Sequence, residues 1–328
     1  MGLTADVSNL KARQWMKSKD FDLLVIGETL VEFSCDDEVS KCGAFQQDIG
    51  GADAVVAAAA ARLGSRVQLI SSIASDPFHN FIRERLAAQN IDISLVRTCQ
   101  GYNGLYITSS LHPEEREYLI HHPGTASQHI VPALIDDRMI ENCKIVYASS
   151  ELQSVSRQTR YAVFKAFHFA HSNHIMVAYD PNLRLMRWSL DDVRECLWSV
   201  MSLIDVMFLS SPEESKALFG YERPLDVIGF LWDRGVDTAV IKTGANGCMV
   251  GYDRKIRVFT QPDPPGFMPF KTPTLVGSAF NGGFLHSIAS GFDPFEAAEL
   301  ANSVALFKGI KGGGIDSLPT IADVRRGG

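Results

Sequence analysis

The chain alternates short apolar runs with amphipathic stretches from residue 21 onward. The run "FDLLVIG" predicts a buried strand that ends at Gly27, and a second strand passes through Val31 and Phe33. The alanine-rich segment 52–63 stops before Gly64, which predicts a closely packed helix with a glycine cap. A further strand and helix follow. This alternation is typical of a parallel α/β sheet.

Residues 101–122 interrupt this rhythm with two β-rich runs joined by a polar loop that contains "HPEE". The pattern predicts a hairpin that forms a small separate sheet with residues 31–48. A small sheet set over the strand ends of an α/β core serves as a lid. We therefore expect a three-layer α/β sandwich with this lid, an N-terminal extension over residues 1–20 and one domain over 21–328.

Composition narrows the function classes. The 328 residues, 46% hydrophobic and 21% charged, suffice for a large core. A net charge of -7 without a basic block argues against nucleic acid as a partner. No apolar run has the length of a signal peptide or a membrane span, so we expect no membrane partner. The six cysteines form no CxxC pair, which predicts reduced thiols in a cytoplasmic protein.

The stretch "TPTLVGSAFNGGFLHSIASG" at residues 272–291 predicts a turn that leads into a helix with a small, apolar stripe. Backbone N–H groups at such a helix start suit a phosphate. An acid beside the phosphate could act as a base, but this chain has Ser278 there. Leu275 and Val276 are bulky where such turns favour glycine. The stretch predicts a phosphate-holding turn with altered chemistry.

Five segments occur in a specific order, namely "DIGGADAVVAAAAARLG", "VAYDPNLR", "LSSPEESKALFG", "VIKTGANGCMV" and "TPTLVGSAFNGGFL". Together they resemble the signatures of the ribokinase/PfkB family of carbohydrate kinases, from about Phe21 to the C-terminus. The words "DPNLR" and "EREYLIHHPGTAS" are most similar to the 2-keto-3-deoxygluconate kinases. The resemblance implies a ribokinase-like fold, ATP and magnesium as cofactors if nucleotide binding is retained, and a sugar or sugar acid as the ligand.

On the substrate side, the resemblance assigns Glu28, Gly50, Gly51, Asp53, His122 and Asp180. Glycines at 50 and 51 allow backbone to approach a ligand closely. The asparagine that contacts sugar hydroxyls in the family is Val55 here, and a buried hydroxyl without its partner costs about 1–3 kcal/mol. His122 replaces the arginine that the keto-acid kinases use for the substrate carboxylate, and a neutral imidazole cannot replace a bidentate guanidinium.

On the nucleotide side, the resemblance assigns Asn182, Arg184, Lys242, Gly244, Gly247 and Asn302, and it assigns Glu214 to magnesium-bound water. Simpler interpretations stay open at each place. Asp180 or Asn182 could cap a helix, the "KTGANG" segment could be a plain β-turn, and Glu214 could be a surface glutamate. The asparagine that precedes the acid of this motif in the family is Ser211 here.

The catalytic signature departs most. Gly277 and Ser278 belong to "LVGS", where the family has GAGD. In the family this aspartate accepts the proton of the sugar hydroxyl, whereas serine is no base at neutral pH. Loss of a general base costs roughly 10²–10⁴ in rate. The departures favour a non-catalytic descendant that binds a small ligand or a protein partner. The alternative is an active kinase whose base is His286 or a water held by Asp180.

The expected lid carries more apolar side chains than a small solvent-facing sheet needs. These are Phe45, Tyr102, Leu105, Tyr106 and Leu119. We therefore expect lid-to-lid dimerisation.

Overall fold

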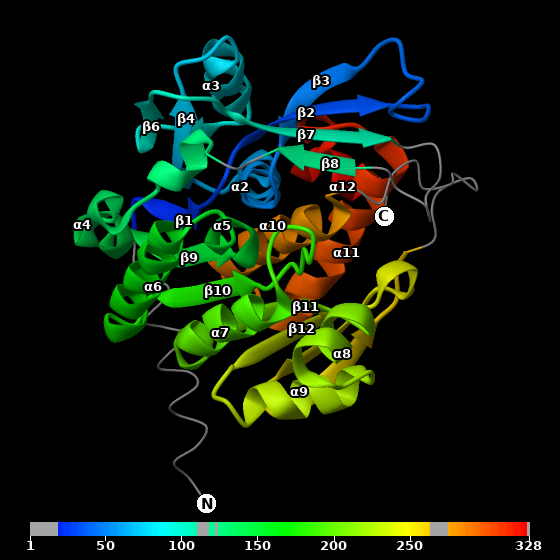
Figure 1. Ribbon diagram of the computed structural model, residues 1–328. Coiled ribbons are helices and arrows are strands. Elements are labelled where there is room, and N and C mark those ends of the chain that lie inside the picture. Colours follow the sequence, from blue (N-terminus) through cyan, green and yellow to red (C-terminus); the bar gives the residue numbers. More distant parts are fainter. Residues whose placement is uncertain (1–18, 110–117, 122–123, 263–274, 327–328) are drawn as a thin grey trace, which may run out of the picture.

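The main sheet forms the middle of three layers in the computed structural model, which describes residues 19–109, 118–121, 124–262 and 275–326 (Figure 1). The strand order is β14-β13-β12-β11-β10-β9-β1-β4-β5, with β6 also paired to β4. Strands from β12 to β5 run parallel, and β13 and β14 are antiparallel. The predicted parallel α/β core is confirmed. The strands of this sheet are β1 (Phe21–Ile26), β4 (Val67–Ala74), β5 (Ile91–Asp92), β6 (Val96–Cys99), β9 (Cys143–Ser149), β10 (Met176–Asp180), β11 (Val206–Ser210), β12 (Thr238–Lys242), β13 (Cys248–Tyr252) and β14 (Lys255–Phe259).

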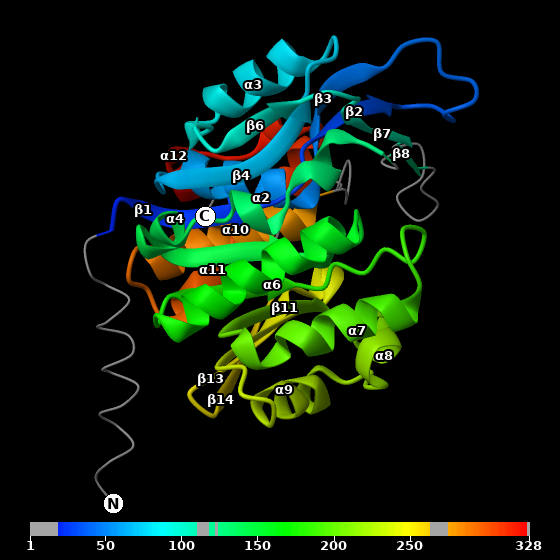
Figure 2. The same cartoon turned by 60° about the vertical axis from the view of Figure 1, so that its left-hand side comes forward.

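Helices cover both faces of this sheet (Figure 2). Side chains of β1 alternate between the two faces, with Leu23 and Val25 in one apolar core and Leu24 and Ile26 in the other. The first core holds α2 (Ala52–Leu63), α3 (His79–Ala88), α10 (Val276–Ala289), α11 (Pro294–Lys311) and α12 (Ile321–Arg326). The second holds α4 (Asp137–Glu141), α5 (Ser150–Gln153), α6 (Arg157–Ser172), α7 (Leu190–Val200), α8 (Glu213–Phe219) and α9 (Pro224–Trp232). Short 3-10 turns are η1 (Ala126–His129), η2 (Pro132–Leu134), η3 (Met201–Leu203), η4 (Gly244–Asn246) and η5 (Ile315–Ser317).

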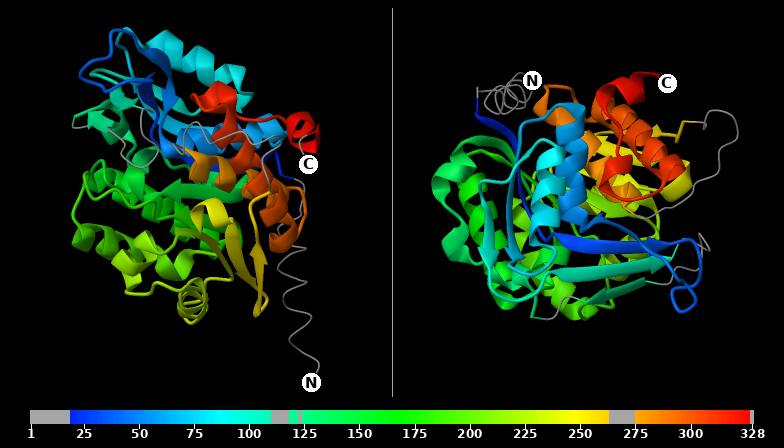
Figure 3. Two further views of the ribbon diagram at one scale, coloured as in Figure 1. Left: turned by 90° about the vertical axis from the view of Figure 1, so that its right-hand side faces the viewer. Right: turned by 90° about the horizontal axis from the view of Figure 1, so that it is seen from above.

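A second sheet stands apart from the main sheet (Figure 3). Its order is β3-β2-β7-β8, with strands β2 (Leu30–Cys35), β3 (Gln46–Gly50), β7 (Gly104–Ser109) and β8 (Tyr118–His121). The expected hairpin is the antiparallel pair β7 and β8, and β7 joins β2 in parallel register. The predicted small sheet is confirmed, and we call it the lid.

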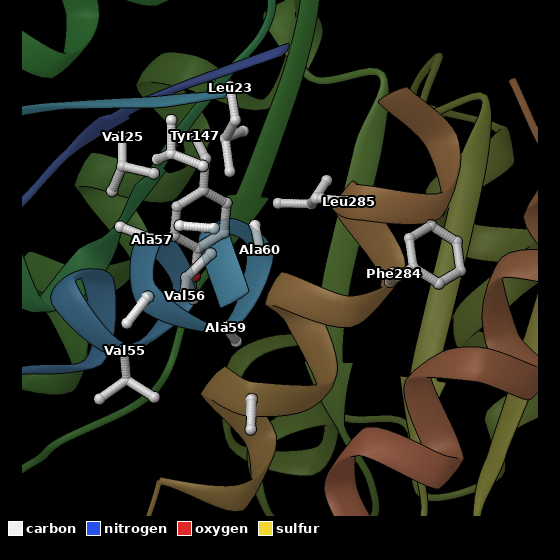
Figure 4. Packing of buried hydrophobic residues seen from close by; sticks show 14 of the residues in the cluster. Leu23, Val25, Val55, Val56, Ala57, Ala59, Ala60, Tyr147, Phe284 and Leu285 are labelled. Carbon is white, nitrogen blue, oxygen red and sulfur yellow. The ribbon is translucent and has the colours of Figure 1, made fainter. Parts of the chain in front are cut away.

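Helices α2 and α10 pack closely against each other, and Val56, Ala59 and Ala60 of α2 lie beside α10 (Figure 4). A Cβ placed on Gly282 of α10 would lie 2.6 Å from both the Cβ of Ala59 and the carbonyl oxygen of Val56. Only glycine at position 282 lets the two helices come this close. The same close contact leaves room for only small side chains on the facing side of α2, which explains why this helix is rich in alanine. The N-terminal ends of α2 and α10 are thereby held side by side. No helix in the described ranges is both long and apolar enough to cross a bilayer.

Candidate functional site

A cavity of about 270 Å³ lies between the lid and the carboxyl ends of neighbouring parallel strands. The main sheet contributes the last residues of β10, β11 and β12, and the two helix starts contribute backbone. The lining residues are Leu30, Gly51, Ala52, Tyr106, Ile120, Glu151, Asp180, Asn182, Arg184, Ser210, Lys242, Leu275, Gly277 and Ser278. Seven of the residues predicted from sequence therefore meet around one cavity: Gly51, Asp180, Asn182, Arg184, Lys242, Gly277 and Ser278.

The Asp180 carboxylate is the centre of a polar cluster on the cavity floor. Its Oδ2 accepts from Lys242 Nζ at 2.7 Å and from Asn281 Nδ2 at 2.6 Å. Its Oδ1 accepts from the backbone N–H of Asn182 at 2.9 Å, which shapes the turn after β10. Asp180 is 3% exposed. Three donors, one cationic and two amide, therefore hold the carboxylate in place.

The start of α10 faces the same cavity. Leu275 precedes the helix with φ 60° and ψ 7°, a left-handed conformation that glycine adopts without strain. The apolar side chain of Leu275 at the N-cap position makes no capping hydrogen bond to the first N–H groups of the helix. Gly277 lies beside Lys242, whose Nζ would be in ordinary van der Waals contact, 3.5 Å, with a Cβ placed there. Helix end and ammonium together suit a phosphate.

A row of alternating charges leads from the core to the cavity. Glu28, at the end of β1, binds Arg187 at 2.7 Å, and both side chains are 1% exposed. Arg187 lies 3.7 Å from Glu151, and Glu151 binds Arg184 Nε at 3.1 Å. Glu151 also accepts from the backbone N–H of Ala52 at 3.4 Å and so caps α2 from another element. Burial raises the pKa of Glu28, against the lowering by Arg187.

Asp53 lies one layer below the cavity, in the first turn of α2. It is fully buried, and its β-carbon fills the space that a side chain on Gly27 would need. Burial raises its pKa well above the usual range, and the charges of Glu151 and Glu28 act in the same direction. Asp53 and Glu28 are buried and do not line the cavity, and their assignment as substrate contacts stays a prediction.

Glu214 was assigned to magnesium-bound water. Its carboxylate accepts backbone N–H groups from Ser210 at 2.7 Å and Leu183 at 2.5 Å, and it is 6% exposed. Burial, with the charge of Asp180 beside it, raises its pKa to about 7. It joins the loop after β10 to the end of β11, so it is not the exposed surface glutamate of the simpler interpretation. Within the described ranges, no group of three His, Cys, Asp or Glu side chains could hold a metal ion.

Three residues assigned to the nucleotide, Gly244, Gly247 and Asn302, lie outside the cavity lining. Gly244 and Gly247 have φ of 64° and 94°, and a Cβ on Gly247 would meet the carbonyl oxygen of Phe259 at 2.0 Å. The turn therefore needs glycine for its own shape. Asn302 is buried and donates to the carbonyl oxygen of Phe259 at 3.3 Å. These contacts account for the residues structurally, and their role toward a nucleotide stays a prediction.

Three further residues complete the comparison with the expectations. Gly50 lies in β3 beside Glu32 and Tyr106, next to the cavity wall. His122 lies outside the described residues. His286 bonds Ser65 at 2.8 Å and does not line the cavity, because it lies more than two helical turns beyond Ser278. The expectation that His286 could serve as the base is therefore wrong.

Sequence reasoning missed Glu151, Arg187 and Asn281, the side chains that hold the cavity wall together. One signal was present for Glu151, which lies two residues after the end of the buried strand β9. Val55, the position where the resemblance expects a sugar-contacting asparagine, belongs to α2, is fully buried in the first apolar core and does not line the cavity.

Comparisons with known proteins agree with this architecture. The family model "pfkB family carbohydrate kinase" matches residues 20–321. The chain is 24% identical over 322 residues to the 5-dehydro-2-deoxygluconokinase of Clostridium perfringens, covering 94% of this chain and 93% of that protein. It is 27% identical over 303 residues to the 2-dehydro-3-deoxygluconokinase of Thermoproteus tenax, covering 88% and 89%. A putative ribokinase II from E. coli, solved with ATP and Mg, has a TM-score of 0.84 at 21% identity over 93% of this chain and 98% of that one. The chain belongs to the PfkB family of carbohydrate kinases.

Proposed function

We propose that this chain binds a small sugar in the cavity below the lid but transfers a phosphoryl group to it at most very slowly. It would then act as a sugar-binding, non-catalytic member of its family. The alternative is an active carbohydrate or keto-sugar-acid kinase with a base other than the usual aspartate.

The observation that best supports this proposal is that the carboxylates around the cavity are already ion-paired. Among the described lining residues only Glu151 and Asp180 are acids, and both are ion-paired, with Arg184 and Lys242 respectively. Taking up the proton of a hydroxyl would neutralise the carboxylate and break its ion pair, which argues against either acid as the general base. Ser278 stands at the helix start where the family places its aspartate, and a hydroxyl cannot take this role at neutral pH. The alternative thus depends on a water held by Asp180.

The groups that would hold a phosphate suit their ligand better than Glu214 suits a magnesium ion. The start of α10, Gly277 and Lys242 would hold a terminal phosphate. ATP bound there would supply the phosphoryl group. Glu214 is already engaged by two backbone N–H groups, so it would reach a magnesium ion only through water. We therefore propose ATP with magnesium as the cofactor pair if nucleotide binding is retained.

The decisive experiment restores the missing chemistry stepwise. Ser278→Asp would place a carboxylate at the helix start, where the helix dipole favours its ionised form. Leu275→Gly with Val276→Ala would relax the preceding turn. We expect each change alone to restore little and all three together to raise sugar-dependent ADP release by more than the product of the separate effects, because these residues act as a unit.

Wild-type protein should show no sugar-dependent ADP release above background in the same assay. Calorimetric titration of ATP–magnesium and sugars separates binding from turnover. Robust wild-type turnover of any sugar or keto acid that survives Ser278→Ala would overturn the non-catalytic proposal and favour the alternative.

We further propose a homodimer formed through the lid. Phe45, Tyr102 and Leu119 are 40%, 75% and 57% exposed, which leaves apolar surface to cover. Leu105 packs on the core and Tyr106 lines the cavity, so these two do not contribute as expected. Light scattering that gives a monomer mass at micromolar concentration would contradict this. A protein partner on the same surface is the other possibility.

We also propose a cytoplasmic location, which the six free cysteines support.

A further inference from the structure

We propose that Glu151 makes the cavity selective for a neutral sugar over a sugar acid. This inference rests on the proposed sugar site and names its substrate class. It concerns the end of the cavity formed by the start of α2, where Glu151 and Arg184 line the wall together.

The carboxylate of Glu151 occupies the place that an anionic ligand would take. A helix N-terminus and a guanidinium are the two features that bind carboxylates best in proteins. Here both are used by the protein itself, since Glu151 Oε1 accepts from Arg184 Nε at 3.1 Å and Oε2 accepts from the backbone N–H of Ala52 at 3.4 Å. The side chain of Glu151 is only 9% exposed.

Glu151 is also held from below. Arg187, 1% exposed, lies 3.7 Å from Glu151 Oε2 and is anchored by Glu28 at 2.7 Å. Moving Glu151 aside would leave this buried guanidinium with one carboxylate instead of two. An entering acid therefore cannot displace Glu151 without a large loss of buried pairing.

The charges of the wall are balanced without a ligand. Within the described lining, the charged side chains are Glu151, Asp180, Arg184 and Lys242, two of each sign, and they form two pairs. A ligand carboxylate would add an uncompensated negative charge beside Glu151. Neutral hydroxyls fit, because they donate to carboxylate oxygens and accept from guanidinium N–H groups.

The test uses two ligands that differ only in the group in question. 2-Keto-3-deoxygluconate carries a carboxylate where 3-deoxyfructose carries a hydroxymethyl group. We expect calorimetry on the wild-type protein at neutral pH to show at least about tenfold tighter binding of 3-deoxyfructose, since two like charges close together in a partly buried site repel strongly. This comparison needs no variant.

Glu151→Gln keeps the shape of the side chain and removes its charge. We expect it to raise the affinity for the acid at least about tenfold and not to raise the affinity for 3-deoxyfructose, because only the acid is repelled by the charge that is removed. Glu195→Gln on the exposed face of α7 is the matched control, because it makes the same change in net charge away from the cavity, and it should alter neither affinity.

Each outcome decides the question. Tighter binding of the neutral sugar, reversed or narrowed by Glu151→Gln alone, supports the inference. Equal or tighter binding of the acid to the wild type refutes the role of Glu151 and leaves the sugar site standing. If calorimetry detects no binding of either ligand to the wild type or to any variant, the proposed sugar site is refuted, and this inference fails with it.

Discussion

The left-handed conformation of Leu275 leads to a stability test with an unusual sign. Its carbonyl oxygen accepts the backbone N–H of Ala279 at 2.9 Å, so this residue sets the direction in which α10 starts. A residue with a Cβ at φ 60° costs about 1–2 kcal/mol relative to its ordinary conformation, and glycine avoids this cost. Glycine elsewhere in a helix is less stable than alanine by about 1 kcal/mol.

We therefore compare Leu275→Gly with Leu275→Ala, because both remove the same leucine packing beyond the β-carbon. We expect the glycine variant to have the higher free energy of unfolding, by about 1 kcal/mol, measured by urea denaturation followed by circular dichroism. The matched pair Glu195→Gly and Glu195→Ala, at an exposed position inside α7, should show the opposite order. Glycine below alanine at both positions would refute the argument that the turn is strained at Leu275.

Three further changes test the packing and charges around the site. Gly282→Ala should lower the free energy of unfolding by about 1–3 kcal/mol, because the added Cβ would overlap α2. Gly229→Ala in α9, where the space around the glycine is open, should raise the free energy of unfolding slightly. Equal effects of the two changes in urea denaturation would contradict this reasoning. Arg187→Met should cost about 3–5 kcal/mol by leaving Glu28 buried without its partner, and adding Glu28→Met should regain part of the loss; a double variant less stable than the single one would argue against a charge effect. Burial raises the pKa of Glu32 from 4.5 to about 7, so its protonated form stabilises the fold fully below pH 4.5 and this stability is lost as the pH rises through about 7. Glu32→Gln should remove that part of the decline, as unfolding curves at several pH values would show.

The local sequence was sufficient to predict most of the strands and helices and where the helices begin. Runs of apolar residues with period two and an alanine-rich stretch specify strands and a closely packed helix because backbone periodicity decides which side chains can be buried together. The glycine preference of the turn before α10 was likewise visible as an unusual Leu275, and the structure shows the positive φ there. The edge strand β14 and the helices α9, α11 and α12 were not predicted. β14 is largely exposed, so it lacks the apolar run that marked the other strands.

The charge pairing was decided by the tertiary structure alone. Glu28, Glu151 and Arg187 are far apart along the chain, and each taken singly is an ordinary surface residue type. Parallel strands bring their carboxyl ends to one edge, so these side chains meet there although no local pattern links them. Burial then forces them to pair, since an isolated charge without water is too costly. The sequence by itself therefore determined the family architecture and the serine at position 278, whereas only the fold determined which charges around the cavity are paired with one another.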